Sequence, residues 1–143
     1  MRLTEVSYGN ARAIEGYGPG FFRVAGHVLR GACLITPWDA GPWGGFDDVA
    51  APLTLVGRID VLFVGTGAVV THVPTAFRQA LEAEGIGVEP MASPAACRTY
   101  NVLLGEGRRV AVALLPLGGI RAPERAVVAS YQDAWTWFRI RRS

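Results

Sequence analysis

Two short stretches carry the residue types best suited to hold a small anion. Gly65-Thr66-Gly67 directly follows the apolar run at residues 61–64, and small residues in such a turn let backbone N–H groups approach a ligand. Arg98-Thr99-Tyr100-Asn101 is the most polar part of an otherwise apolar segment. Ligands of open α/β sheets favour the carboxyl ends of strands, so one hypothesis is a pocket framed by the two stretches. The alternatives are a tightly packed turn at the first stretch and hydrogen bonds that fix the fold at the second.

Nucleophilic and metal chemistry have weaker support. A helix dipole could lower the pKa of Cys97, near the start of a predicted helix, but neither His27 nor His72 lies near it in the sequence to act as a base. We therefore predict that Cys97 and Cys33 are buried core residues. Two cysteines and two isolated histidines are too few for a zinc site. The pair Asp47-Asp48 is predicted to be a solvated turn or a helix start. We predict no catalytic residues, metal or cofactor.

The C-terminal segment is the third candidate. A helix is predicted from Pro123 onward, because apolar residues recur at helical spacing on one face. Two further apolar residues fall on the other side, and the chain ends in arginines. Trp and Arg are enriched where proteins bind partners, and they also suit a membrane surface. Partner binding, peripheral membrane contact and packing on the chain's own domain all stay open. The partner-binding candidates are Trp137, Arg139, Ile140, Arg141 and Arg142.

Composition narrows the class of protein. The chain has 143 residues, of which 50% are hydrophobic, enough for one compact domain. Its net charge is only +2 and the signs are mixed, so no basic stripe suggests nucleic acid. All 14 basic residues are arginine, which coding bias of the source genome explains. No apolar run approaches the roughly 18 residues of a transmembrane helix, and the start does not suggest a secretory signal. We expect a cytoplasmic protein.

The order of predicted elements indicates an α/β fold. Residues 1–20 are interpreted as an entry loop and residues 36–52 as a long loop. A hairpin is predicted from residues 21–24 and 27–35, joined by Ala25-Gly26. Ser93 is predicted to cap the second helix, with Pro94 at its first position. Strand, helix, strand, helix, strand with short connections indicates parallel strands joined by crossover helices. The predicted elements are strand 61–64, helix 75–84, strand 88–91, helix 93–104 and strand 110–115.

Several motifs together resemble one family. They are Gly16-Tyr17-Gly18-Pro19-Gly20-Phe21, Gly65-Thr66-Gly67, Gly85-Ile86-Gly87-Val88-Glu89, and the long stretch from Met91-Ala92-Ser93-Pro94 through Thr99-Tyr100-Asn101-Val102-Leu103, followed by Glu106-Gly107-Arg108-Arg109-Val110. In this order they resemble the small domain family of largely unknown function that includes the mitochondrial respiratory complex I assembly factor 3 and the adipogenesis-associated domain protein. The resemblance covers residues 14–117.

The resemblance implies a single three-layer domain around a central mixed sheet, without established catalytic residues or a cofactor. Residues 1–13 would then be a lead-in, 14–117 the core and 118–143 a helical extension. It also implies a non-enzymatic protein-interaction module linked to complex I assembly, with a protein partner. A location at the inner membrane surface is an extension of that hypothesis. The alternative is a small anionic-ligand-binding protein or uncharacterised enzyme with its pocket near Gly65–Gly67 and Arg98–Asn101.

Overall fold

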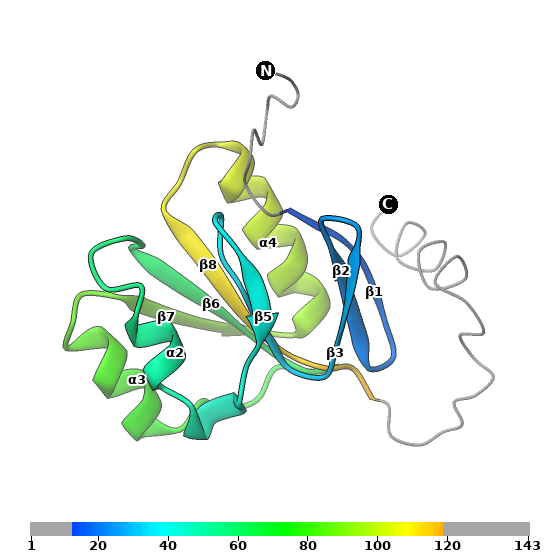
Figure 1. The fold of residues 1–143 in the computed structure, drawn as a ribbon. Helices are drawn as coiled ribbons and strands as arrows, with labels where there is room; N and C mark the ends of the chain where they lie inside the picture. The colour runs from blue at the N-terminus through cyan, green and yellow to red at the C-terminus, as the bar shows by residue number, and fades with distance from the viewer. Residues whose placement is uncertain (1–12, 119–143) are drawn as a thin grey trace.

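The computed structural model describes residues 13–118. The C-terminal partner-binding candidates and the helix predicted there lie outside the described residues, as does most of the N-terminal lead-in. Within residues 13–118 the chain forms the predicted α/β domain, with one small and one larger sheet (Figure 1).

The small sheet is antiparallel, in the order β1 (Ile14–Gly18), β2 (Phe21–Val24), β3 (His27–Arg30). The predicted hairpin turn is confirmed, because Ala25 and Gly26 both have positive φ, 52° and 80°, as a two-residue turn between twisted strands requires. The prediction of an entry loop was wrong for β1. Its glycines weakened the sequence signal for a strand, because glycine is unfavourable inside strands. The register of β1 against β2 shifts between Ile14 and Gly16 in the manner of a β-bulge.

The larger sheet is mixed and has the order β5-β4-β8-β6-β7. The neighbouring strands β8, β6 and β7 are parallel to one another, as predicted. In contrast, β4 runs antiparallel to β8, and β5 runs antiparallel to β4. The run predicted as one strand at 27–35 divides at Gly31, where φ is 82°, so that β3 and β4 join different sheets. The strands are β4 (Cys33–Ile35), β5 (Ala40–Pro42), β6 (Val61–Thr66), β7 (Gly87–Met91) and β8 (Val110–Leu115).

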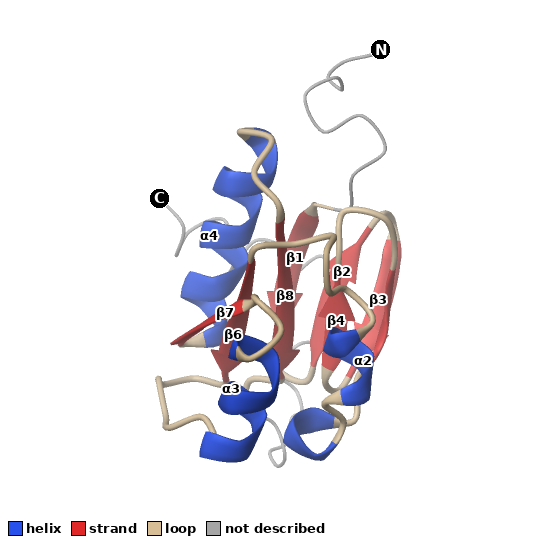
Figure 2. Ribbon diagram, turned by 90° about the vertical axis from the view of Figure 1, so that its left-hand side faces the viewer, coloured by secondary structure: helices blue, strands red, loops and turns tan. Residues whose placement is uncertain are grey.

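Helices lie on both faces of this sheet (Figure 2). On one face is α4 (Ser93–Gly105), and on the other are α2 (Ala50–Leu53) and α3 (Thr75–Glu82). A short 3-10 helix η1 (Gly45–Asp47) precedes α2, so the segment predicted as a long loop contains β5, η1 and the start of α2. The helix predicted at 75–84 ends slightly earlier, followed by Gly85 with a φ of 89°.

Two apolar cores follow from the alternation of side chains along the strands. In β8, Val112 and Leu114 pack in the core beneath α4, whereas Ala111 and Ala113 pack in the core beneath α3. The small sheet contributes Tyr17 and its neighbours to the α4 core. Strands covered on both faces read as continuous apolar runs, which is why β6 and β8 were recognisable in the sequence.

Both edge strands of the larger sheet contain a proline, Pro42 in β5 and Pro90 in β7. Proline has no N–H group and is typical of edges that resist pairing with another strand. At the β7 edge, Nη1 of Arg78 also donates a hydrogen bond to the carbonyl oxygen of Val88, at 3.0 Å. These features disfavour the addition of a partner's strand to this sheet.

Candidate functional site

Gly65, at the end of β6, is in close contact with the start of α4. A Cβ atom at this position would lie 2.7 Å from Oγ and 2.8 Å from Cα of Ser93, and 2.7 Å from Cδ2 of Leu114. Side chains of the core and of α4 therefore fill the space next to Gly65. This contact favours close backbone packing as the reason for a glycine here.

Ser93 connects three segments through hydrogen bonds. Its Oγ accepts a hydrogen bond from the N–H of Gly67 at 2.9 Å and donates one to the carbonyl oxygen of Leu115 at 2.7 Å. Its own N–H donates to the carbonyl oxygen of Gly67 at 2.7 Å. The prediction that Ser93 is the N-cap was wrong: Ala92 is the N-cap residue and makes no side-chain cap bond. The Ser93 hydroxyl instead joins the carboxyl ends of β6 and β8.

Thr66 holds the loop that follows β6. Its hydroxyl donates to the carbonyl oxygen of Val69 at 2.7 Å and accepts from the N–H of Thr71 at 2.9 Å. The loop is thereby folded back on the end of the strand. It presents Val69 and Val70 to solvent with 65% and 60% of their surface exposed. The Thr66 hydroxyl therefore fixes a turn whose exposed residues are apolar.

The four polar residues of α4 point in different directions, as expected from the helical period. Asn101 is joined to β1: its Oδ1 accepts from the N–H of Ile14, and its Nδ2 donates to the carbonyl oxygen of Ile14, both at 2.8 Å. Tyr100 is fully buried, and burial raises the pKa of its hydroxyl. Arg98 and Thr99 are half-buried. The Asn101 contacts agree with a role in fixing the fold.

Both cysteines lie in the core beneath α4, as predicted. Burial raises the pKa of Cys33 to about 12. The pKa of Cys97 is raised chiefly by burial and further by the neighbouring Cys33, and the opposing effect of Arg98 is smaller. The lowering that a helix dipole could give is therefore outweighed by loss of solvent. Neither thiol has the character of a nucleophile in this fold.

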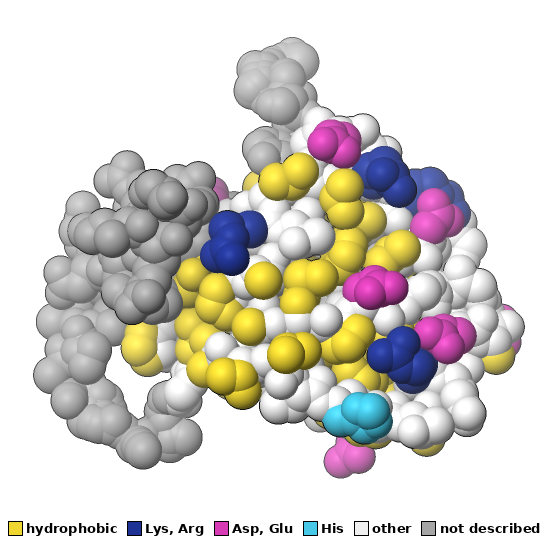
Figure 3. All heavy atoms as spheres, turned by 180° about the vertical axis from the view of Figure 1, so that it is seen from behind, with side chains coloured by type: hydrophobic (Ala, Val, Ile, Leu, Met, Phe, Trp, Pro, Cys, Tyr) yellow, Lys and Arg dark blue, Asp and Glu magenta, His cyan; other side chains and the backbone are white. Residues whose placement is uncertain are grey.

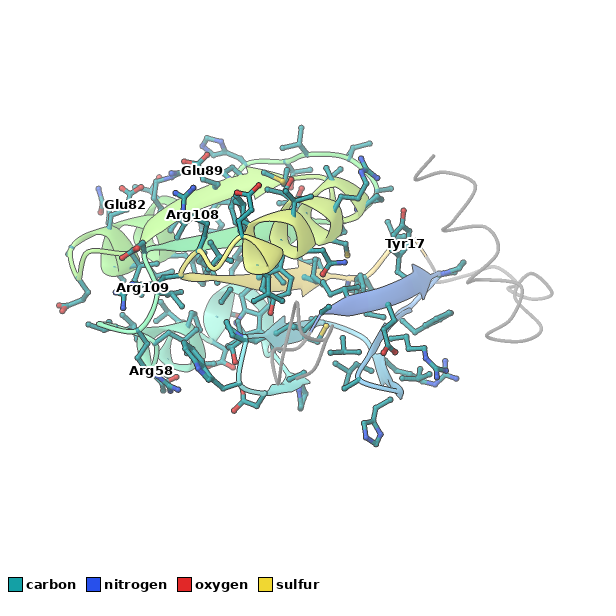
Figure 4. All side chains as sticks on the ribbon, turned by 90° about the horizontal axis from the view of Figure 1, so that it is seen from above. Tyr17, Arg58, Glu82, Glu89, Arg108 and Arg109 are labelled. Atoms are coloured by element: carbon teal, nitrogen blue, oxygen red, sulfur yellow. The ribbon has the colours of Figure 1, made fainter. Side chains whose placement is uncertain are left out.

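The charged residues of the described part of the chain do not gather into an acid–base set. Figure 4 shows that five labelled residues lie toward the end of the domain opposite Tyr17, on several different elements. Their signs are mixed, and one of them, Arg109, pairs with Asp60 at 3.2 Å. Within residues 13–118, no group of three His, Cys, Asp or Glu side chains could hold a metal ion. The five are Arg58, Glu82, Glu89, Arg108 and Arg109.

The pair Asp47-Asp48 lies at a helix start, one of the two placements predicted for it. The carboxylate of Asp48 accepts hydrogen bonds from the N–H groups of Gly44 and Ala51, at 3.1 and 3.2 Å. These bonds order the approach to α2 and give Asp48 a structural role.

A shallow cleft of about 310 Å³ lies between the β4–β5 hairpin and the α2 region. Sequence patterns did not reveal it, because its walls form only when the β4–β5 hairpin folds against residues 51–58. Arg58 lines it and stacks over the ring of Trp38 at 4.0 Å from the ring centroid. The only signal was the aromatic content of residues 36–52. The cleft is lined by Leu34, Thr36, Asp39, Ala40, Gly41, Pro42, Ala51, Thr54, Leu55 and Arg58.

The outer surface of α4 is apolar in part. Val102 is 59% exposed, and Pro94 and Ala95 are half-buried beside the partly covered Met91 and Leu103. We call these five residues the α4 patch. Figure 3, seen from the side on which α4 lies, shows hydrophobic side chains gathered over this face. Among helices of the described residues, none is long and apolar enough to cross a membrane.

These features define a class: a small α/β domain whose polar loop and helix residues Thr66, Ser93 and Asn101 are engaged in internal hydrogen bonds, with exposed apolar side chains on the loop after β6 and on α4. The chain belongs to the family described as "Protein of unknown function (DUF498/DUF598)", whose sequence model matches residues 14–115. The resemblance inferred from the sequence motifs is thus confirmed.

Individual relatives carry more specific descriptions. An uncharacterized protein of Rhodobacter capsulatus, RCAP_rcc01784, is 52% identical over 119 residues, covering 83% of this chain and 96% of that protein. The human NADH dehydrogenase [ubiquinone] 1 alpha subcomplex assembly factor 3 is 32% identical over 126 residues, covering 83% of this chain and 68% of the factor. A crystal structure described as an outer membrane protein from Bartonella henselae is 34% identical, with a TM-score of 0.69, over 76% of this chain and 98% of that one.

Proposed function

We propose that this chain is a non-enzymatic protein-interaction module that assists assembly of a membrane-bound respiratory NADH dehydrogenase. The observation that carries the proposal is the similarity to vertebrate assembly factors, which extends over most of this chain, including both stretches singled out as candidate sites. The buried state of the two thiols is in keeping with a role other than nucleophilic catalysis. We further propose that the protein acts at the cytoplasmic side of the membrane.

The partner surface in this proposal includes the C-terminal residues Trp137, Arg139, Ile140, Arg141 and Arg142. Trp and Arg are the residue types that most often dominate binding energy at protein interfaces. The prolines in both edge strands of the larger sheet favour a partner that binds through side chains rather than by strand addition.

A gene deletion tests the assembly role. We expect the deletion strain to contain less fully assembled NADH dehydrogenase on native gels, and the wild-type gene to restore it. A Trp137→Ala, Ile140→Ala double variant should restore it poorly. The matched control is Trp38→Ala, which removes a tryptophan that is 44% exposed on the described domain. Normal levels of assembled NADH dehydrogenase in the deletion strain would refute the assembly role. If the double variant and Trp38→Ala restore assembly equally poorly, the C-terminal residues have no special part in that role.

The second proposal, an anion pocket near Gly65–Gly67 and Arg98–Asn101, has less support. An anion at the glycine turn would need free N–H groups, and that of Gly67 is donated to Ser93. A thermal-shift screen with nucleotides, phosphate and carboxylates is the test. A ligand at 100 times its dissociation constant adds about 2.7 kcal/mol to the free energy of unfolding, so specific binding would be visible. We expect no shift, and a saturable shift abolished by Arg98→Ala would favour the pocket.

A further inference from the structure

We propose that the α4 patch is the docking site for the chain's own C-terminal segment, residues 119–143. This intramolecular contact does not depend on the assembly role. The first observation is the patch itself, which leaves Val102 mostly exposed on a helix whose other side is packed in the core. The other four residues of the patch are half-buried and extend the apolar surface around Val102, and contiguous apolar surface often marks a binding site.

The second observation is where the described chain ends. The N-terminal end of α4 is joined to the end of β8 through the Ser93 hydrogen bond to Leu115. Two residues further along the chain, the carbonyl oxygen of Leu117 accepts a hydrogen bond from the N–H of Gly20 at 3.1 Å. The described chain therefore ends three residues beyond Leu115, the residue that is bonded to the start of α4. The valine loop that Thr66 holds in place also begins here, since a Cβ on Gly67 would lie 3.6 Å from the carbonyl oxygen of Pro116.

The third observation is the length and pattern of the segment. It has 25 residues, and its sequence predicts a helix from Pro123 to about Ile140. At 1.5 Å per residue such a helix would measure about 27 Å, against about 20 Å for α4, so it could run along the whole patch. Its apolar face would meet the patch, which is the arrangement that buries both surfaces from water. That face consists of Val127, Val128, Tyr131, Trp135 and Phe138.

The same arrangement would turn the other face of the segment toward solvent. Trp137 and Ile140 fall opposite the docked residues on a helical projection, so docking would turn them outward. The family match ends at residue 115. The segment thus lies outside the stretch that the family model matches, and it would cover a surface which that stretch leaves open.

Thiol labelling of the full-length protein tests the contact. Val102→Cys places a reactive group in the patch, and the native Cys33 and Cys97 serve as silent internal reporters because they are buried. We compare its labelling rate with that in a chain that also carries Tyr131→Asp and Trp135→Asp. The matched control is Val56→Cys, in the turn after α2, with and without the two segment substitutions; Val56 is 39% exposed.

We expect the patch thiol to be labelled about tenfold more slowly when the segment is intact, as a docked population of about nine in ten would give. The control thiol should react equally in both backgrounds. Equal rates for the patch thiol would overturn the proposal. Protection that grows with protein concentration would also overturn it, because the occupant would then be a second copy. Labelling of Cys33 and Cys97 would reveal unfolding, in which case Tyr131→Ala and Trp135→Ala replace the charged substitutions.

Discussion

The two hydrogen bonds between Asn101 and Ile14 join the last long helix to the first strand, 87 residues apart in the chain. Replacing Asn101 by Ala removes two hydrogen bonds at once, one to the N–H group and one to the carbonyl oxygen of Ile14. Ile14 is only 3% exposed, so its N–H and C=O groups would be left poorly hydrated. The substitution therefore tests whether the polar stretch of α4 serves the fold.

The expected cost follows from the geometry. Both bonds are 2.8 Å long, and a buried hydrogen bond contributes a net of about 0.5–1.5 kcal/mol. Leaving a buried partner unpaired costs about 1–3 kcal/mol per group, although water can reach part of this sheet edge. We expect Asn101→Ala to lower the free energy of unfolding by about 2–4 kcal/mol. With a typical urea m value, the unfolding midpoint should fall by about 1–2 M.

The matched control is Arg98→Ala on the same helix. Arg98 is half-buried, and no hydrogen bond or ion pair joins it to another described residue. We expect this variant to change the free energy of unfolding by less than about 1 kcal/mol. If Asn101→Ala proves no less stable than Arg98→Ala, the structural role of Asn101 is refuted. Urea unfolding followed by circular dichroism measures both variants under the same conditions.

Three further predictions concern packing, pH and surface charge. Gly65→Ala should cost about 1–3 kcal/mol, because its Cβ would clash at 2.7–2.8 Å, whereas Gly87→Ala, with contacts of 3.6 Å and longer, should be nearly neutral; equal urea midpoints would contradict the packing argument. Burial raises the pKa of Cys33 from 9.0 to about 12, so the unfolded chain loses this proton first. The free energy of unfolding should hold below about pH 9 and then fall as the pH rises, with Cys33 contributing about 1.4 kcal/mol per pH unit beside the buried Cys97, so Cys33→Ala should make that fall shallower in urea titrations. Arg109→Ala should cost less than about 1 kcal/mol at low salt and less still at 1 M salt, because its pair with Asp60 is exposed; a larger, salt-independent loss would argue otherwise.

The amino-acid sequence by itself determined the strands and helices whose pattern is local. The apolar runs of β6 and β8 are buried on both faces, so every residue in them is selected for the core, and the pattern is visible without neighbours. The hairpin turn at Ala25-Gly26 and the helix stop at Gly85 depend on positive φ, which glycine signals directly. The family resemblance likewise rested on short local motifs.

Tertiary structure decided what depends on segments that meet across the chain. The pairing that makes β1 a strand comes from β2 and from Asn101, neither of which the glycine-rich sequence of β1 reveals. Ser93 looked like a helix cap because that pattern is local, but its hydroxyl is used by Gly67 and Leu115, which only the folded sheet brings to it. The same holds for the α4 patch: the helical period marks which residues share a face, whereas the packing of the whole domain decides which face stays open to water.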